Sequence, residues 1–290
     1  GLPQGLTRWE RTLAELLSAQ GYATAHFGKW HLGDIEGRYP SDRGFDEWYG
    51  IPRTTDESQF TSTVGFDPSV ADIPHIMRGR RGEPSEIVKV YDLDSRRGID
   101  AELVEHAQAF MQRHHAARKP FFLYLPLVHL HFPTLPHPDF AGRTGAGDFA
   151  DSMVEMDHRV GQIVDQVERL GIADDTLFIF CSDNGPEFRA PYRGTAGPWR
   201  GTYHTAMEGS LRVPFIARWP GRIAPGRTSN ELVHVTDLFT TLAAVAGAPL
   251  PADRPIDGVD QRAFLFGEQE KSAREGFLFY IKNDLRAVKW

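Results

Sequence analysis

The chain has 290 residues, of which 41% are hydrophobic, so it is long enough to bury the core of one large domain with a small appendage. Its formal net charge is -7 and no basic stripe is visible, which argues against nucleic acid as a partner. The longest apolar runs, such as PFFLYLPLV, are too short to cross a membrane. A single cysteine, Cys181, excludes an internal disulfide and a cysteine-based zinc site. The opening residues carry no signal-peptide pattern, and the compartment stays open.

The first helix is expected just after Thr12, because Thr12 and Glu15 form a capping-box pattern and Gly21 is a natural stop. The segment YATAHF, residues 22–27, follows as a short buried strand. Residues 53–84 carry turn residues and little periodicity, and we expect them to form a long surface loop.

A second helix is predicted over residues 100–113, where apolar residues recur at helical spacing. The apolar run FFLYLPL after Pro120 predicts a buried strand, and the Pro- and His-rich run HLHFPTLPHP predicts a loop. A third helix is expected over residues 149–170, with Gly171 as its stop. Its buried stripe is expected to hold seven apolar residues: Met153, Met156, Val160, Ile163, Val164, Val167 and Leu170.

Two further buried strands are expected in DTLFIFC, residues 175–181, and RVPFIARWPG, residues 212–221. The run TDLFTTLAAVAG predicts a helix that ends at Gly247. The tail FLFYIKNDLRAVKW predicts a β-hairpin with its turn at Asn283 and Asp284.

Strands and helices alternate along the chain, and the strands are continuously apolar. This pattern predicts an α/β fold with a mostly parallel central sheet and helices on both faces. In such folds the functional site lies beyond the carboxyl ends of the strands. Three polar clusters are expected there: Lys29 with His31, His129 with His131, and Asp183 with Asn184.

The SDNG run offers ligands for a hard cation. The carboxylate of Asp183 and the amide carbonyl of Asn184 suit Ca²⁺ or Mg²⁺, and Gly185 allows a sharp turn beside them. Asp-Asn-Gly is also ordinary turn chemistry. Two ligands do not complete a site for a cation that takes six or more.

Lys29 and His31 share a face if their segment stays extended, with Trp30 turned into the core. The lysine could neutralise an anion and the histidine could move a proton; a plain surface strand end is the competing interpretation. His129 and His131 are also two residues apart, so in an extended segment they would face the same way. They could bind an anion, protonate a leaving group or ligate a metal, or they could be ordinary loop histidines.

The run WRGTYHTAMEGSLRVP leads into a strand and carries Arg200, His204, Glu208 and Arg212. Its glycines suggest a constrained loop that could bind an anion. A purely structural ion pair between Glu208 and Arg212 is the other interpretation, because residues four apart on a helix are neighbours.

Six segments in order resemble the sulfatase family, in the alkaline-phosphatase-like superfamily. They cover most of the chain: TLAELLSAQGYATAHFGKWHLGD, RGFDEWYG, PFFLYLPLVHLHFPTLPHP, MVEMDHRVGQIVDQVERLGIADDTLFIFCSDNGPE, EGSLRVPFIARWPG and VTDLFTTLAAVAG. GKWHLG is the specific motif, and SDNG is specific only in that context. The resemblance implies a sulfatase-like catalytic domain over residues 1–270, truncated at its start, and the beginning of a C-terminal antiparallel subdomain over 271–290.

The resemblance implies transfer of sulfate from an ester to a formylglycine hydrate, with Ca²⁺, or Mg²⁺ in its place, as cofactor. Lys29 looks like the lysine that contacts the sulfate and the hydrate. His31 looks like the histidine that takes a proton from the hydrate, and His131 like the one that holds or protonates the leaving-group oxygen. Asp183 and Asn184 look like two of the calcium ligands. The implied substrate is a small-molecule or glycan sulfate ester.

The chain departs from the family's pattern in three places. No C/S-x-P-x-R stretch, which carries the family's nucleophile, occurs here, and Cys181 in FCSDNG is not that residue. The strand that ends in the family's paired metal aspartates is also missing. Tyr203, with His204 beside it, stands where the family has a second sulfate-binding lysine. Tyr203, His204 and the nearby Arg200 are therefore the candidate substrate-binding residues.

These departures lead us to expect a fragment that lacks the nucleophile segment and the C-terminal end. Such a fragment should be inactive alone and should bind Ca²⁺ poorly. The longer protein would need a formylglycine-generating enzyme as a partner. Two other functions stay open: a phosphonate or phosphate ester hydrolase of the same superfamily, and a non-catalytic protein that binds sulfated glycans.

Overall fold

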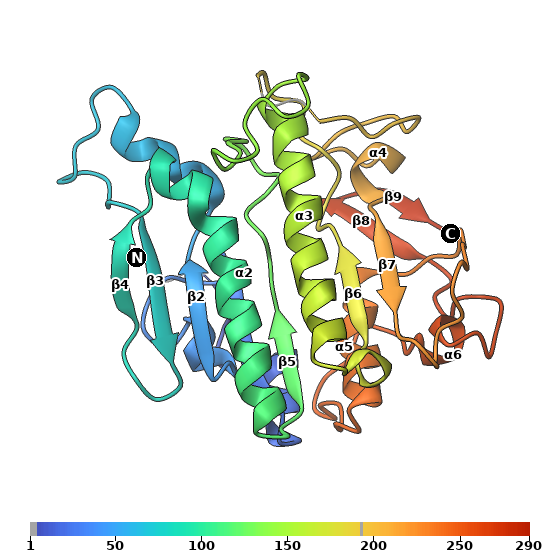
Figure 1. Cartoon of the computed structure of the whole chain (residues 1–290). Coiled ribbons are helices and arrows are strands. Elements are labelled where there is room, and N and C mark those ends of the chain that lie inside the picture. Colours follow the sequence, from blue (N-terminus) through green and yellow to red (C-terminus); the bar gives the residue numbers. More distant parts are fainter. Residues whose placement is uncertain (1–4, 192–193) are drawn as a thin grey trace. The chain divides into compact units, whose positions relative to one another are not determined.

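The computed structural model describes residues 5–191 and 194–290. The chain forms two compact units, Gly1–Gln166 and Val167–Trp290, and each is described by itself. Figure 1 shows the elements of both units along the chain. No helix in the described ranges combines the length and the apolar character that a membrane span needs.

The first unit contains a five-stranded sheet with the order β4-β3-β2-β1-β5. Its centre is parallel: β1 (Ala23–Lys29) pairs in parallel with β2 (Glu47–Ile51) on one side and with β5 (Phe121–Tyr124) on the other. Six of the seven residues of β1 are buried, as the continuous apolar run predicts. The carboxyl ends of these three strands therefore meet at one edge of the sheet.

Part of the predicted surface loop over residues 53–84 is regular structure. It holds a 3₁₀ helix, η2 (Thr55–Ser62), and β3 (His75–Arg80), which pairs antiparallel with β2 and with β4 (Glu86–Val90). The prediction of a loop was wrong here because β3, with the sequence HIMRGR, buries only two of its six residues. A strand of that kind has no apolar run to mark it.

Helices cover both faces of β1. The helix α1 (Leu13–Ala19) begins at the expected capping box of Thr12 and Glu15 and packs against β1. The helix α2 (Leu93–Ala116), longer than predicted at both ends, packs against β1, β2 and β5. Figure 1 shows α2 running between the labelled strands β2 and β5. Successive side chains of a strand point to opposite faces. His26 accordingly lies among aromatic rings on the α1 side, and Phe27 contacts Phe110 of α2.

His26, the histidine of β1, is fully buried. Its ring lies 5.2 Å from that of Trp30, 5.4 Å from Phe45 and 5.5 Å from Tyr124, measured between ring centroids. Burial lowers the pKa of His26 to about 3, although backbone groups of Lys29 and of His26 itself oppose the shift. The imidazole is therefore neutral in the folded chain across the physiological pH range.

The third predicted helix is α3 (Asp148–Arg169), but the first turns of its buried face are polar. Met153 is 44% exposed, whereas Asp151, Ser152 and Glu155 are buried. Ile163 and Val167, further along the predicted stripe, are buried as expected. The apolar stripe thus describes only the second half of α3, because the first half buries charged groups that have partners elsewhere in the fold.

The second unit pairs β6 (Phe178–Cys181) with β7 (Phe215–Arg218) in antiparallel orientation. Between them lies a short helix, α4 (Glu208–Leu211), and a short 3₁₀ helix, η3 (Ala173–Asp175), precedes β6. The predicted helix ending at Gly247 is α5 (Val235–Val245), which begins at a capping box formed by His234 and Asp237.

The chain closes with α6 (Arg262–Leu265) and the predicted hairpin of β8 (Phe277–Ile281) and β9 (Asp284–Lys289). The hairpin turn lies at Lys282 and Asn283, one residue earlier than predicted, and Lys282 takes a positive φ of 55°. With its parallel sheet centre, surrounding helices and small C-terminal antiparallel sheet, the chain has the predicted α/β fold.

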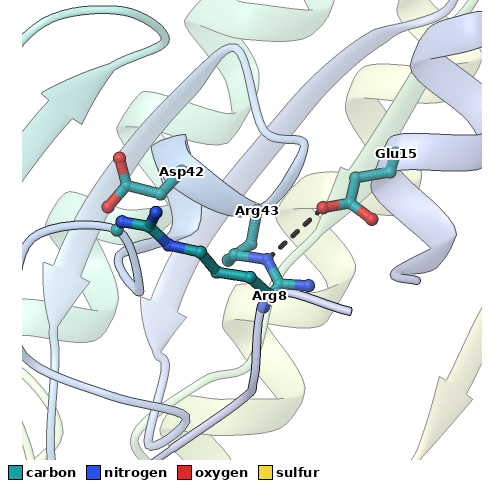
Figure 2. A pocket seen from close by; sticks show the side chains of 5 residues that line it. Arg8, Glu15, Asp42 and Arg43 are labelled. Carbon is teal, nitrogen blue, oxygen red and sulfur yellow. Dashed lines mark hydrogen bonds and ion pairs between the residues drawn. The ribbon is translucent and has the colours of Figure 1, made fainter. Parts of the chain in front are cut away.

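The remaining 3₁₀ helix, η1 (Pro40–Arg43), anchors the N-terminal segment of the first unit. The buried Arg43 donates to the carbonyls of Leu6, Thr7 and Glu10 and pairs with Glu15 at 3.3 Å. A hollow of about 340 Å³ lies beside it, and Figure 2 shows the Arg43–Glu15 pair in its wall. The Arg43 guanidinium is already bound by these protein acceptors, so we assign it a structural role and do not count the hollow as a candidate site.

Candidate functional site

The GKWHLG segment forms the carboxyl end of β1. Lys29 is its last strand residue, and the indole nitrogen of the buried Trp30 donates to the carbonyl of Arg38 at 2.8 Å, so Trp30 faces the core as predicted. The predicted extended course fails at His31, which has a positive φ of 55°. Tertiary contacts set this backbone: the N–H groups of Trp30 and His31 donate to the carbonyls of Ile51 and Pro52.

A close backbone contact brings the chain after β5 to the end of β1. The N–H of Lys29 donates to the carbonyl of Pro126 at 3.2 Å. Gly28 has a φ of 139°, and a Cβ there would lie 1.9 Å from the same oxygen. Only glycine allows this approach. The HLHFP loop, which follows Pro126, therefore starts at the same sheet edge as Lys29.

Three of the predicted side chains act on one another at this edge. The pKa of His31 is lowered by desolvation of its ring, and the nearby charges of Lys29 and His131 lower it further. The carboxylate of Asp56 opposes the shift. Asp56 was not foreseen, because nothing in the run TTDESQF distinguishes it from ordinary polar loop residues. These electrostatic effects on His31 indicate that Lys29 and His131 lie near its ring.

The ring of His131 is held in one orientation. Its Nδ1 lies 2.7 Å from the carbonyl oxygen of Phe132, and the two rings stack with centroids 4.7 Å apart. A carbonyl only accepts hydrogen bonds, so this contact assigns the proton to Nδ1. The Nε2 atom is left to exchange a proton with another group.

His129 does not join this group. It is buried, with Nδ1 at 3.1 Å from an Arg96 nitrogen and Nε2 at 3.0 Å from a Glu155 oxygen. The expectation that His129 and His131 share a face was wrong, because the segment is an irregular loop and not an extended strand. Arg96 and Glu155 were also missed, since buried charged residues on helices carry no local sequence signal.

In the second unit, Asp183 and Asn184 follow β6, as predicted. Asn184 donates its Nδ2 to the carbonyl of Gly185 at 2.9 Å, so Oδ1 is the atom it can offer a cation. The N–H of Gly185 donates to the carbonyl of Ser210, and a Cβ at Gly185 would lie 1.8 Å from the carbonyl oxygen of Gly209. This contact ties the SDNG turn to α4, and the N–H of Tyr203, on the loop before α4, donates to the carbonyl of Pro186.

The candidate substrate-binding residues lie on that loop. Tyr203 and His204 have ring centroids 4.0 Å apart, and His204 takes a positive φ of 64°. The pKa of Tyr203 is raised by desolvation and by the charges of Glu187 and Asp183, so Tyr203 lies near the SDNG turn. Arg200 is exposed, and its carbonyl accepts from Gly209 at 2.7 Å.

Glu208 and Arg212 form the structural ion pair that their spacing suggested. Their closest nitrogen and oxygen atoms are 3.8 Å apart, and Glu208 also pairs with Lys289 of β9. The Arg212 guanidinium lies 4.4 Å above the ring centroid of Trp199. These side chains are therefore engaged with the protein and are not candidates for anion binding.

The oxygens of Asp183 and Asn184 fit a hard cation in kind but fall short in number. Across the residues that the structure describes, no group of three or more His, Cys, Asp or Glu side chains could hold a metal ion. Ca²⁺ takes six to eight oxygen ligands. The two side chains fit at most a part of such a site, and the remaining ligands would have to come from elsewhere.

Comparisons with known proteins agree on one family. The family model described as Sulfatase matches residues 2–248. Arylsulfatase A of Homo sapiens is 38% identical over 283 residues, covering 95% of this chain and 55% of its own length. N-acetylgalactosamine-6-sulfatase of Canis lupus familiaris is 35% identical, covering 97% of this chain and 52% of its own length. The chain therefore spans about half the length of these curated relatives.

The fold agrees with the same family. The crystal structure of the PsFucS1 sulfatase from Pseudoalteromonas sp. superposes with a TM-score of 0.93 at 32% sequence identity, covering 100% of this chain and 62% of that chain.

Proposed function

The chain belongs to the sulfatase family, and on that premise we propose that it acts in the hydrolysis of sulfuric esters, with Lys29, His31 and His131 handling the anion and the protons. The observation that carries the proposal is the gathering of these three side chains at the carboxyl edge of a parallel sheet. This is the edge where α/β folds place their ligands.

Each side chain has a task that its chemistry suits. The Lys29 ammonium would bind sulfate oxygens and stabilise the charge that develops as the ester S–O bond breaks. The lowered pKa of His31 keeps its imidazole neutral near pH 7, so it can accept a proton. His131, fixed through Nδ1, would donate from a protonated Nε2 to the leaving-group oxygen and return to the neutral form.

A cation and a formylglycine complete the proposal. Asp183 and Asn184 would supply two oxygen ligands to Ca²⁺ or Mg²⁺, which when bound adds positive charge against sulfate oxygens. The C/S-x-P-x-R pattern does not occur in the sequence. The nucleophile would therefore come from outside these 290 residues, after the action of a formylglycine-generating enzyme, and the chain alone would be inactive.

Tyr203, His204 and Arg200 are the residues that we propose to bind the substrate anion on the loop before α4. A tyrosine hydroxyl donates a hydrogen bond where a lysine would supply a full charge. The substrate class would be a small-molecule or glycan sulfate ester, as the names arylsulfatase and N-acetylgalactosamine-6-sulfatase of the relatives suggest.

The binding half of the proposal is testable on this chain. Inorganic sulfate should shift the side-chain NMR signals of His31 and His131, and Lys29→Met should abolish the shifts. Lys282→Met, at the hairpin turn of the other unit, is the matched control and should leave them intact. Equal shifts in all three proteins would refute an anion site at Lys29. Metal-dependent turnover of 4-nitrophenyl sulfate by the 290-residue chain would refute the external nucleophile.

A second candidate is a phosphonate or phosphate ester hydrolase of the same superfamily. The observation that favours it is Tyr203 at a position where sulfatases carry a lysine, because fewer fixed charges make the site less specific for sulfate. Titrations of the chain with sulfate and with methylphosphonate separate the two. Tighter binding of methylphosphonate would favour the second candidate.

A further inference from the structure

We propose that Arg96, His129 and Glu155 form a buried positioning network that holds the ring of His131 in its working orientation. The inference rests on the role proposed above for His131. The three residues come from α2, from the loop after β5 and from the buried face of α3. All three side chains are inaccessible to solvent. They are therefore positioning residues, which do not touch substrate.

The hydrogen bonds of the network allow only one arrangement of protons. Arg96 can only donate, so its Nη2 donates to Nδ1 of His129 at 3.1 Å. A neutral His129 must then carry its proton on Nε2, and this atom faces a Glu155 carboxylate oxygen at 3.0 Å. Burial alone would raise the pKa of Glu155, but hydrogen bonds from His129 and the His137 backbone, with the Arg159 charge, lower it to about 2.

Side chains of the network also form hydrogen bonds with the backbone around His131. The same Arg96 Nη2 lies 3.3 Å from the carbonyl oxygen of His131. Glu155 accepts from the N–H of His137 at 2.7 Å. Asp100 of α2 accepts from the N–H groups of Val128 and His129 at 2.7 and 3.1 Å. The loop is thus held on both sides of His131 and at His131 itself.

The hydrogen bond from Arg96 to the backbone also affects the orientation of the His131 ring. Arg96 fixes the peptide group between His131 and Phe132 through its carbonyl oxygen. The next carbonyl, that of Phe132, accepts from Nδ1 of the His131 ring. If the first peptide group rotates, the second carbonyl leaves the ring. Arg96 therefore controls which nitrogen of His131 carries the proton, and Nε2 is kept for the leaving group.

A purely structural role makes a different prediction. The network is close to neutral overall, since Arg96 and Arg159 balance Asp100 and Glu155. Replacing a buried ion pair by apolar groups changes protein stability in either direction, so a lower melting temperature does not distinguish a structural role from a positioning role. The tautomer of His131 does discriminate, because only the positioning role couples it to Arg96.

The experiment measures histidine tautomers by long-range ¹H–¹⁵N correlation in the 290-residue chain. Arg96→Met should reduce the ratio of the Nδ1–H to the Nε2–H tautomer of His131 by about fivefold, the ratio that a hydrogen bond of ~1 kcal/mol sustains. Arg96→Lys should restore part of the ratio. Arg159→Met is the matched control: it removes a buried arginine that pairs with Glu155 and lies over the ring of Phe140, away from the His131 peptide group, and it should leave the ratio unchanged.

The outcomes separate this proposal from the proposed function. An unchanged His131 tautomer in a folded Arg96→Met protein would overturn the positioning role, as would an equal change in Arg159→Met. If Arg96→Met does not fold, Glu155→Gln keeps the side-chain volume and should shift the His131 tautomer in the same direction; no shift would again overturn the proposal. The readout needs no sulfate, so a failure of sulfate binding would bear on the proposed function alone.

Discussion

Replacing His26 should remove a large part of the acid sensitivity of this chain. The imidazole is fully buried among three aromatic rings, and its ring nitrogens have no hydrogen bond of good geometry to a described residue. Because its folded-state pKa is about 3, against 6.5 for the free side chain, protons bind to His26 mainly in the unfolded chain. The contribution of the neutral His26 to the free energy of unfolding is therefore fully present above about pH 6.5, and it is lost as the pH falls toward 3.

The magnitude follows from the two pKa values. Between about pH 7 and pH 5 an unfolded histidine becomes protonated while the buried one stays neutral, which lowers the free energy of unfolding by about 2 kcal/mol. His26→Phe keeps an aromatic ring among the others and removes the titrating group. The variant should therefore lose about 2 kcal/mol less than the parent over this pH interval.

Urea unfolding followed by circular dichroism at several pH values measures the difference. His115→Asn is the matched control, because His115 is exposed on α2 and its replacement should leave the pH dependence of the parent intact. Other groups contribute equally to parent and variant, so they cancel in the comparison. Parallel curves for the parent and His26→Phe would refute the reasoning.

Three further predictions address the backbone contacts and the site. Gly28→Ala should lower the free energy of unfolding, measured with urea, by about 3 kcal/mol, because the added Cβ would collide with the Pro126 carbonyl. The control Gly161→Ala, where a Cβ on α3 would meet no atom within 4 Å, should be neutral or stabilising, and equal effects of the two substitutions would contradict the clash. Thr12→Ala should lower the free energy of unfolding by about 1 kcal/mol through loss of the α1 cap, and an unchanged urea midpoint would show that the cap does not stabilise the fold. In an NMR titration, Lys29→Met should raise the pKa of His31, since the Lys29 charge lowers it. An unchanged titration midpoint would show that the Lys29 charge does not act on His31.

Local patterns were enough to predict the elements that carry most of the fold. Continuous apolar runs predicted β1 and β5, a capping box predicted the start of α1, and Gly247 predicted the end of α5. The carboxyl ends of parallel strands share an edge of the sheet, so the order of elements is enough to predict that Lys29 and His131 are neighbours.

What local patterns missed depends on partners distant in sequence. The strand β3 is recognisable only by its pairing with β2 and β4. His31 takes its positive φ because its N–H donates to the carbonyl of Pro52, which follows β2. The GKWHLG motif alone does not contain that contact. His129 and His131 look alike in sequence, and only the positions of Arg96 and Glu155 separate a core histidine from one that can exchange protons.

The polar start of α3 has a consequence for the order in which the first unit forms. Asp151 and Glu155 would lose their hydration without compensation if this half of α3 docked against an unformed loop. Glu155 finds its partners in His129 and His137, and Asp151 accepts from Gly142 and Thr144, all of which precede α3 in the chain. The first half of α3 and the loop before it therefore gain or lose their structure together, as one cooperative unit with common hydrogen-exchange protection.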